Sequence, residues 1–188
     1  MNEPTAAPRR VPWRARLLAF APSLAFGLVG VVAWLLLRPD PTPRLQPLPS
    51  LALGLAVGAL LLAAAALLER TVPSFAWVSR TTERALRRLA LPHGVAALLA
   101  LATSVGEELL FRGVLLPTIG LVPQALLFGA LHPAGRRGWS YPLFVAASGL
   151  LLGGLVVVTG RVAAAIVAHA VVNGVGLLRS SRSVPPLR

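Results

Sequence analysis

Long runs of apolar residues, separated by short polar segments, make up most of this sequence. A run that approaches about 20 residues predicts a helix that crosses a lipid bilayer. We therefore predict an all-α fold, a polytopic transmembrane helical bundle with both termini in the cytoplasm. Its six candidate spans lie at about residues 17–37, 51–68, 95–117, 121–131, 142–158 and 161–178.

The fourth run, at residues 121–131, is shorter than the others. At about 1.5 Å per residue it covers only half of the hydrocarbon core. Its helix must therefore be buried among its neighbours, continue past Pro133, or lie beside locally thinned lipid. The sequence leaves these three alternatives open.

The arginines predict the orientation of the bundle. With the N-terminus inside and six crossings, the cytoplasmic segments hold fourteen arginines and the outer ones three, as the positive-inside rule requires. The apolar run from Leu17 is too long for a signal peptide and has no small-x-small exit, so we predict a retained first span. The cytoplasmic arginines are Arg9, Arg10, Arg14, Arg16, Arg70, Arg80, Arg84, Arg87, Arg88, Arg136, Arg137, Arg179, Arg182 and Arg188.

Two connecting segments have distinct compositions. Residues 38–49 are rich in proline, which predicts an extended, non-helical connection on the outside. Residues 74–92 place aromatic and apolar side chains before a stretch that combines leucines with arginines. This pattern is typical of a basic amphipathic helix on an anionic membrane leaflet, and a solvated basic loop is the alternative.

Composition agrees with a membrane protein. The chain is 56% hydrophobic and 13% charged, whereas a soluble domain is about 25% charged. Its net charge of +12 comes from arginines that interrupt apolar runs instead of gathering on a soluble face with stacking aromatics, so no nucleic-acid partner is expected. The absence of cysteine excludes disulfides, thiolate metal sites and cysteine nucleophiles.

Two adjacent carboxylates, Glu107 and Glu108, fall deep inside a predicted span. An ionisable residue at mid-bilayer costs about 2.5–3.5 kcal/mol, so the pair predicts a functional site, with a structural ion pair as the alternative. Glu108 stands four residues before Arg112, the spacing and order at which such side chains meet. Glu107 projects about 100° away around the helix and is predicted to be the free carboxylate.

Two histidines add polar groups to later spans. His132 ends an apolar run, with Phe128 four residues earlier on the same face, and His169 is followed four residues later by Asn173. Three helices that each contribute a polar element favour one common site over separate interhelical hydrogen bonds. The third histidine, His93, precedes a span and is predicted to be interfacial.

These motifs, in this order, resemble the CAAX-protease and bacteriocin-processing (CPBP or Abi) family, also called type II CAAX prenyl endopeptidases. The family signature is a double glutamate followed by an arginine, then Phe-x-x-x-His, then His-x-x-x-Asn or Asp, on successive membrane helices. The resemblance covers about residues 95–178 and implies an all-helical intramembrane endopeptidase.

The resemblance also implies roles for the motif residues. Glu107 would work with His132 to activate a water molecule for attack on a peptide carbonyl. His169 and Asn173 would stabilise the resulting oxyanion, a role that suits neutral donors aimed at developing charge.

The remaining motif residues, Glu108 and Arg112, would support the site. The sequence has no H-E-x-x-H motif, and a set of glutamate, histidine and asparagine supports a metal-free mechanism, so no cofactor is expected; zinc is the less favoured alternative. The expected partners are the lipid bilayer and a membrane-associated peptide or protein substrate. The expected location is the bacterial inner membrane.

The predicted depths of the site residues conflict. Glu107 lies about 18 Å from the cytoplasmic start of its helix, whereas His132 comes at the cytoplasmic end of its own. A tilt or a deeper fourth helix must bring them together. Otherwise His169, about 14 Å deep, is the better partner for Glu107.

By domain, the sequence divides into a two-span region with a basic amphipathic loop (1–94), a four-span catalytic core (95–178) and a basic cytoplasmic tail (179–188). Three alternative functions remain: a non-catalytic immunity or scaffold protein, a protease that removes C-terminal sorting tails, and a small transporter. A non-catalytic member would show degenerate motifs and a transporter would show internal symmetry with broken helices, and we find neither.

Overall fold

The computed structural model describes residues 12–37 and 44–181. Within these ranges the chain is helical and contains no strand, which confirms the all-α prediction. The helices are α1 (Trp13–Leu37), α2 (Pro47–Thr71), α3 (Pro73–Leu89), α4 (His93–Glu108), the π-helix η1 (Leu109–Leu115), α5 (Leu116–Ile119), α6 (Leu121–Ala130), the 3₁₀ turn η2 (Arg136–Gly138), α7 (Ser140–Thr159) and α8 (Val162–Ser181).

Five helical segments of the described chain are long and apolar enough to cross a membrane, as expected of an integral membrane protein. The fourth predicted span does not qualify, because α6 has only ten residues. The expected six spans are therefore five long helices and one short one. The segments that qualify are Phe20–Leu37, Pro47–Thr71, His93–Ile119, Ser140–Thr159 and Val162–Ser181.

The cytoplasmic placement of the termini stays a prediction, as does the division into three domains. Some of the residues on which these two predictions rest lie outside the described residues. They are Arg9, Arg10, Arg38, Arg182, Arg188 and most of the tail 179–188.

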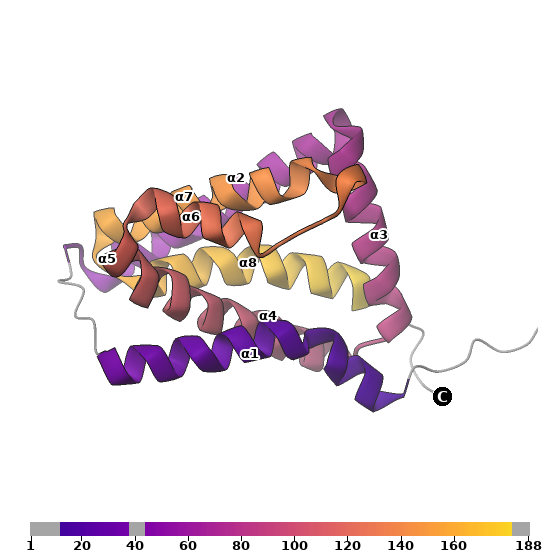
Figure 1. Ribbon diagram of the computed structural model, residues 1–188, viewed down its shortest axis with the longest axis horizontal. Helices are drawn as coiled ribbons and strands as arrows, with labels where there is room; N and C mark the ends of the chain where they lie inside the picture. The colour runs from indigo at the N-terminus through magenta and orange to yellow at the C-terminus, as the bar shows by residue number, and fades with distance from the viewer. Residues whose placement is uncertain (1–11, 38–43, 182–188) are drawn as a thin grey trace, which may run out of the picture.

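Helix α3 lies across one end of the bundle, roughly perpendicular to α1, α4 and α8 (Figure 1). It buries Phe75, Ala76 and Val78 and leaves its arginines exposed. Of the two alternatives for residues 74–92, the amphipathic helix is therefore the one that forms. Its apolar face packs on the bundle, where Phe75 contacts Tyr141 and Phe144, and the contact of α3 with an anionic leaflet stays a prediction.

The proline-rich connection is shorter than predicted, because α2 already begins at Pro47. Prolines are tolerated in the first turn of a helix, where the missing N–H has no intrahelical partner. Ahead of α2, the N–H groups of Arg44 and Leu45 both donate to the carbonyl of Thr159, at 3.0 and 3.1 Å. These bonds attach the connection to the turn between α7 and α8. Residues 38–43 lie outside the described residues.

Small residues let α2 pack closely against α8. A Cβ atom added at Gly54 would lie 2.5 Å from the carbonyl oxygen of Ala164, and one at Gly58 would lie 2.9 Å from that of Ala168. This is a small-x-x-x-small contact, the arrangement that brings helix backbones together in membranes. Helix α8, which carries two of the predicted site residues, is thus held in place by an N-terminal span.

The close packing of α2 against α8 predicts that the protein loses stability when Gly54 is enlarged. Gly54→Ala should destabilise the protein by about 1–3 kcal/mol, because the added methyl group meets backbone that cannot yield. Gly154→Ala is the matched control, since Gly154 also lies inside a helix but has open space where its Cβ would be. Thermal unfolding in detergent measures both variants. Equal midpoints for the two would show that the α2–α8 contact is loose.

Candidate active site

Three ionisable side chains meet in the middle of the bundle. The Oε2 atom of Glu107, at the end of α4, lies 3.9 Å from Nε2 of His132 and 4.0 Å from Nε2 of His169. The side chains are 8%, 31% and 12% exposed, respectively. The structure therefore brings together the polar elements from three helices that the sequence predicted to share a site.

The short helix α6 resolves the conflict of depths. Its ten residues rise about 15 Å, half of the hydrocarbon core, so α6 ends inside the bundle. His132 comes two residues after the last residue of α6, Ala130, and its Nε2 lies 3.9 Å from Glu107 Oε2, so the fourth helix is the deeper one that this pairing required. Pro133 then prevents helical continuation. From there the chain runs to the end of the bundle where α3 lies (Figure 1).

The predicted Glu108–Arg112 pair forms in a fully buried setting. Arg112 Nη1 donates to Glu108 Oε1 at 2.9 Å, and both side chains are 0% exposed. Arg112 lies in η1, one of the π-helical turns that often mark functional sites. Its Nη2 atom also donates to the carbonyl of Gly149 at 3.3 Å, which ties the pair to α7.

The two site histidines are oriented by bonds at Nδ1. His132 Nδ1 lies 2.7 Å from the carbonyl oxygen of Phe128, and His169 Nδ1 lies 2.8 Å from Glu108 Oε1. A carbonyl and a carboxylate accept hydrogen bonds, so each Nδ1 carries the hydrogen. In the neutral rings, both Nε2 atoms then present lone pairs on the side of Glu107.

The aromatic ring of Phe128 lies between the buried Glu108–Arg112 pair and the ring of His132. The Arg112 guanidinium carbon lies 4.5 Å from the ring centroid of Phe128, and the His132 ring lies 4.8 Å from it. Phe128 thus orients His132 both through its carbonyl and through its ring, while it covers the buried arginine.

Asn173 is held by two hydroxyl groups that the sequence analysis missed. Its Nδ2 atom donates to Thr103 Oγ1 at 3.3 Å and to Ser104 Oγ at 3.2 Å. Both hydroxyls in turn donate to main-chain carbonyls of α4, at 2.8 and 2.7 Å. They stand four and three residues before Glu107. That helical spacing within an apolar span was the signal that could have identified them.

Gln124 is a third residue that the sequence did not point to. It is 0% exposed, and its amide nitrogen donates to the carbonyl of Gly149 at 3.1 Å, the same oxygen that Arg112 binds. A lone amide in the apolar run of the fourth span was the available signal. Gln124 therefore fixes the short helix α6 against α7 beside the buried ion pair.

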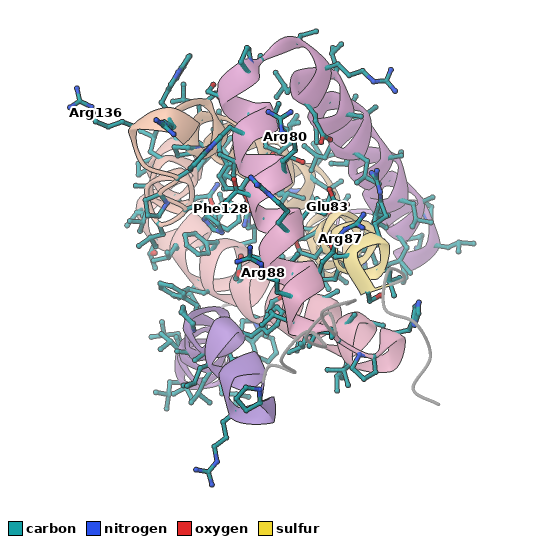
Figure 2. The ribbon with its side chains drawn as sticks, turned by 90° about the vertical axis from the view of Figure 1, so that its right-hand side faces the viewer. Arg80, Glu83, Arg87, Arg88, Phe128 and Arg136 are labelled. Atoms are coloured by element: carbon teal, nitrogen blue, oxygen red, sulfur yellow. The ribbon has the colours of Figure 1, made fainter. Side chains whose placement is uncertain are left out.

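The site opens into a cavity of about 350 Å³. Glu107, His132, His169 and Asn173 line it together with apolar side chains from α7 and α8. Residues of α3 line it as well, so this helix covers one end of the cavity. Figure 2 faces that end, with α3 across the front, its labelled arginines along the helix, and Phe128 visible past its left edge. The third histidine, His93, is exposed at the start of α4 and takes no part.

The donor atoms that could hold a metal are those of Glu107, His132 and His169. A zinc ion bonded at about 2.0–2.1 Å to both Glu107 and one of the histidines would have to fit between atoms 3.9 or 4.0 Å apart. The ligand–zinc–ligand angle would then be far above the tetrahedral value. The described residues contain no group of three or more ligating side chains in a metal-binding arrangement. The separations better match a water molecule placed at hydrogen-bond distance from each atom.

Comparison with known proteins agrees with the resemblance read from the motifs. Residues 90–175 match the family described as type II CAAX prenyl endopeptidase Rce1-like, and this range contains all three motifs. The chain is also similar to the uncharacterized protein YpbD of Bacillus subtilis (strain 168), with 36% identity over 85 residues. That match covers 45% of this chain and 44% of the relative, so less than half of either is compared. No solved structure matches the chain.

Proposed function

Since residues 90–175 match the type II CAAX prenyl endopeptidases, we propose that the protein is an intramembrane endopeptidase that hydrolyses peptide bonds of membrane-associated substrates. One observation carries the proposal. The Glu107 carboxylate converges with Nε2 of His132 and of His169, at 3.9 and 4.0 Å, inside a cavity large enough to admit a peptide segment.

The separations suggest where the attacking water would lie. They are too long for direct hydrogen bonds but allow one water to bridge Glu107 and His132. One hydrogen of this water points to Glu107 Oε2 and the other to the lone pair on His132 Nε2. The water oxygen then attacks the peptide carbonyl as Glu107 takes the proton, a general-base step worth about 10²- to 10⁴-fold in rate.

His169 is the residue we assign to the oxyanion side. Its Nδ1–H is held by Glu108, which Arg112 neutralises in turn, so the ring orientation does not depend on the substrate. His169 can donate from Nε2 to an oxygen in the cavity when its ring carries a second hydrogen. A donor that is already oriented stabilises developing charge without reorganisation. Asn173, one turn along the same helix, lines the same cavity.

We propose the lipid bilayer and a membrane-associated peptide or protein as the partners, and the bacterial cell membrane as the location. The five long apolar helices support the lipid bilayer as a partner, and the Bacillus relative supports the bacterial cell membrane as the location. The mechanism needs no cofactor, because the glutamate and histidines already supply the base and the donors.

Cleavage of membrane-anchored peptides tests the proposal. Detergent-purified wild type and His132→Ala are compared on a library of quenched fluorescent peptides, with and without a chelator. We expect wild type to cut, the variant to be slower by about 10²-fold or more, and the chelator to have no effect.

Undiminished cleavage by His132→Ala would contradict the assigned site. Loss of activity with the chelator, restored by zinc, would instead establish a metal mechanism. Peptide binding by the wild type without any cleavage would favour the non-catalytic scaffold.

A further inference from the structure

Almost every N–H and O–H hydrogen of the side chains that line the cavity already donates to another group of the protein. The histidines His132 and His169 direct their Nδ1 hydrogens to Phe128 and Glu108. The hydroxyl of Ser148 donates to a main-chain carbonyl one turn earlier, at 2.9 Å. An oxyanion that forms in this cavity therefore finds few donors that are free to turn toward it.

Asn173 cannot be one of those donors. The hydroxyls of Thr103 and Ser104 donate their own hydrogens to main-chain carbonyls, so they can only accept a hydrogen bond from Asn173. The amide must present its NH₂ group to these two hydroxyls, at 3.3 and 3.2 Å, and this accounts for both of its hydrogens. The side-chain oxygen of Asn173 is left for the cavity, and an oxygen acceptor repels an oxyanion.

Tyr141 is one of two exceptions on the wall within the described chain. It lines the same cavity as Glu107 and His132, and its hydroxyl has no hydrogen-bond partner among residues 12–37 and 44–181. Its ring packs against Phe75, with centroids 6.0 Å apart, and against the cluster of Phe111 and Phe128. A ring fixed at this position keeps a phenolic hydroxyl, unpaired within the described chain, at the cavity wall.

Thr82 is the other hydroxyl on the wall without a partner in the described chain, but it is exposed on α3 at the end of the cavity. A donor in contact with water gains less from binding a charge than one in an apolar wall, since water screens the interaction. The comparison therefore favours Tyr141.

We propose that Tyr141 donates the hydrogen bond that stabilises the oxyanion, together with His169, and that Asn173 turns its oxygen to the cavity to accept an N–H of the substrate. The inference rests on the proposed function. The water oxygen bonds to the carbonyl carbon, the C=O π electrons move to the oxygen, and Glu107 takes the water proton. Tyr141 keeps its own proton throughout. Collapse breaks the C–N bond, and Glu107 returns the proton to the leaving amine.

Tyr141→Phe is the first test, because it removes only the hydroxyl and keeps the ring. We expect kcat on a cleaved library peptide to fall by about 10²- to 10³-fold with little change in KM. Ser140→Ala is the control: it removes the neighbouring hydroxyl, which is bonded to Ser74 at 2.6 Å, and should leave kcat unchanged. Unaltered kcat in Tyr141→Phe, or an equal loss in Thr82→Val, would overturn the proposal.

Asn173 provides the second test. Asn173→Asp keeps an acceptor toward the cavity, and the hydroxyls of Thr103 and Ser104 can turn to donate to its second oxygen, so it should retain far more activity than Asn173→Ala. If Asn173 were the oxyanion donor, the aspartate would be at least as damaging as the alanine, and that order of activities would reject the assignment.

A third measurement does not require turnover. A peptide whose scissile amide is replaced by a phosphinate carries the negative oxygen of the tetrahedral state. Wild type should bind it about 10²-fold more tightly than Tyr141→Phe, while the parent peptide binds both alike. Equal phosphinate affinities would overturn the role of Tyr141. Full cleavage by a Glu107 variant would instead overturn the proposed function, so the two failures are distinguishable.

Discussion

Replacing Glu107 by glutamine is expected to lower peptide cleavage by about 10²- to 10⁴-fold, the range that a general base contributes. Glutamine has nearly the same shape as glutamate, so the contacts of α4 are kept. What is lost is the ability of Oε2 to take a proton from the water that it shares with His132. The initial rate of cleavage of a membrane-anchored peptide measures the effect.

Glu83→Gln is the matched control, since it makes the same change on the exposed face of α3, where Glu83 pairs with Arg87. It should cleave at the wild-type rate. Both variants should keep the wild-type unfolding midpoint. A Glu107→Gln protein that cuts as fast as Glu83→Gln would remove Glu107 from the mechanism.

Replacing Arg112 by methionine is expected to destabilise the protein by about 3–5 kcal/mol, because it leaves the buried carboxylate of Glu108 without its cation and with only the hydrogen bond from His169. Methionine fills much of the volume and can still pack against Phe128. The loss is therefore assigned to the unpaired charge. Thermal or denaturant unfolding in detergent measures the stability.

An exposed pair with the same spacing serves as the control. Glu83 and Arg87 also stand four residues apart, but their side chains are 38% and 49% exposed. Arg87→Met should therefore cost at most about 1 kcal/mol. Adding Glu108→Gln to Arg112→Met should recover part of the stability, because the stranded charge is gone. Equal losses for the two arginine variants would show that burial does not decide the contribution of the pair.

The double variant also separates stability from catalysis. It should remain slow in cleavage even where it is stable, since His169 loses the carboxylate that holds its Nδ1–H. Recovery of both properties together would show that Glu108 acts only through folding.

Most of the helices could be predicted from the sequence because a membrane span depends on the length and polarity of one continuous segment. The Glu108–Arg112 pair could be predicted for a similar reason, since four residues along one helix bring two side chains together. The start of α2 was misjudged, because proline is excluded from helix interiors but not from a first turn.

The depth of His132 needed the tertiary structure. It depends on where the ten residues of α6 stop within a bundle formed by the other helices. The direction in which Asn173 faces was likewise hidden, because it is decided by Thr103 and Ser104, about 70 residues away in the chain. Neither the depth of His132 nor the orientation of Asn173 produces a repeating pattern of residue types along the sequence.

The sequence by itself thus determined which segments form the long apolar helices, which carboxylate pairs with Arg112 and which residue types are available for chemistry, because each of these depends on neighbours along one helix. Only the tertiary structure decided that Glu107 lies equally near two histidines, that Asn173 donates both hydrogens to α4, and that Tyr141 lines the cavity without a hydrogen-bond partner in the described part of the chain. These depend on the packing of helices that are remote in the chain, and hydrogen-bond donors can be assigned only when every acceptor around them is in place.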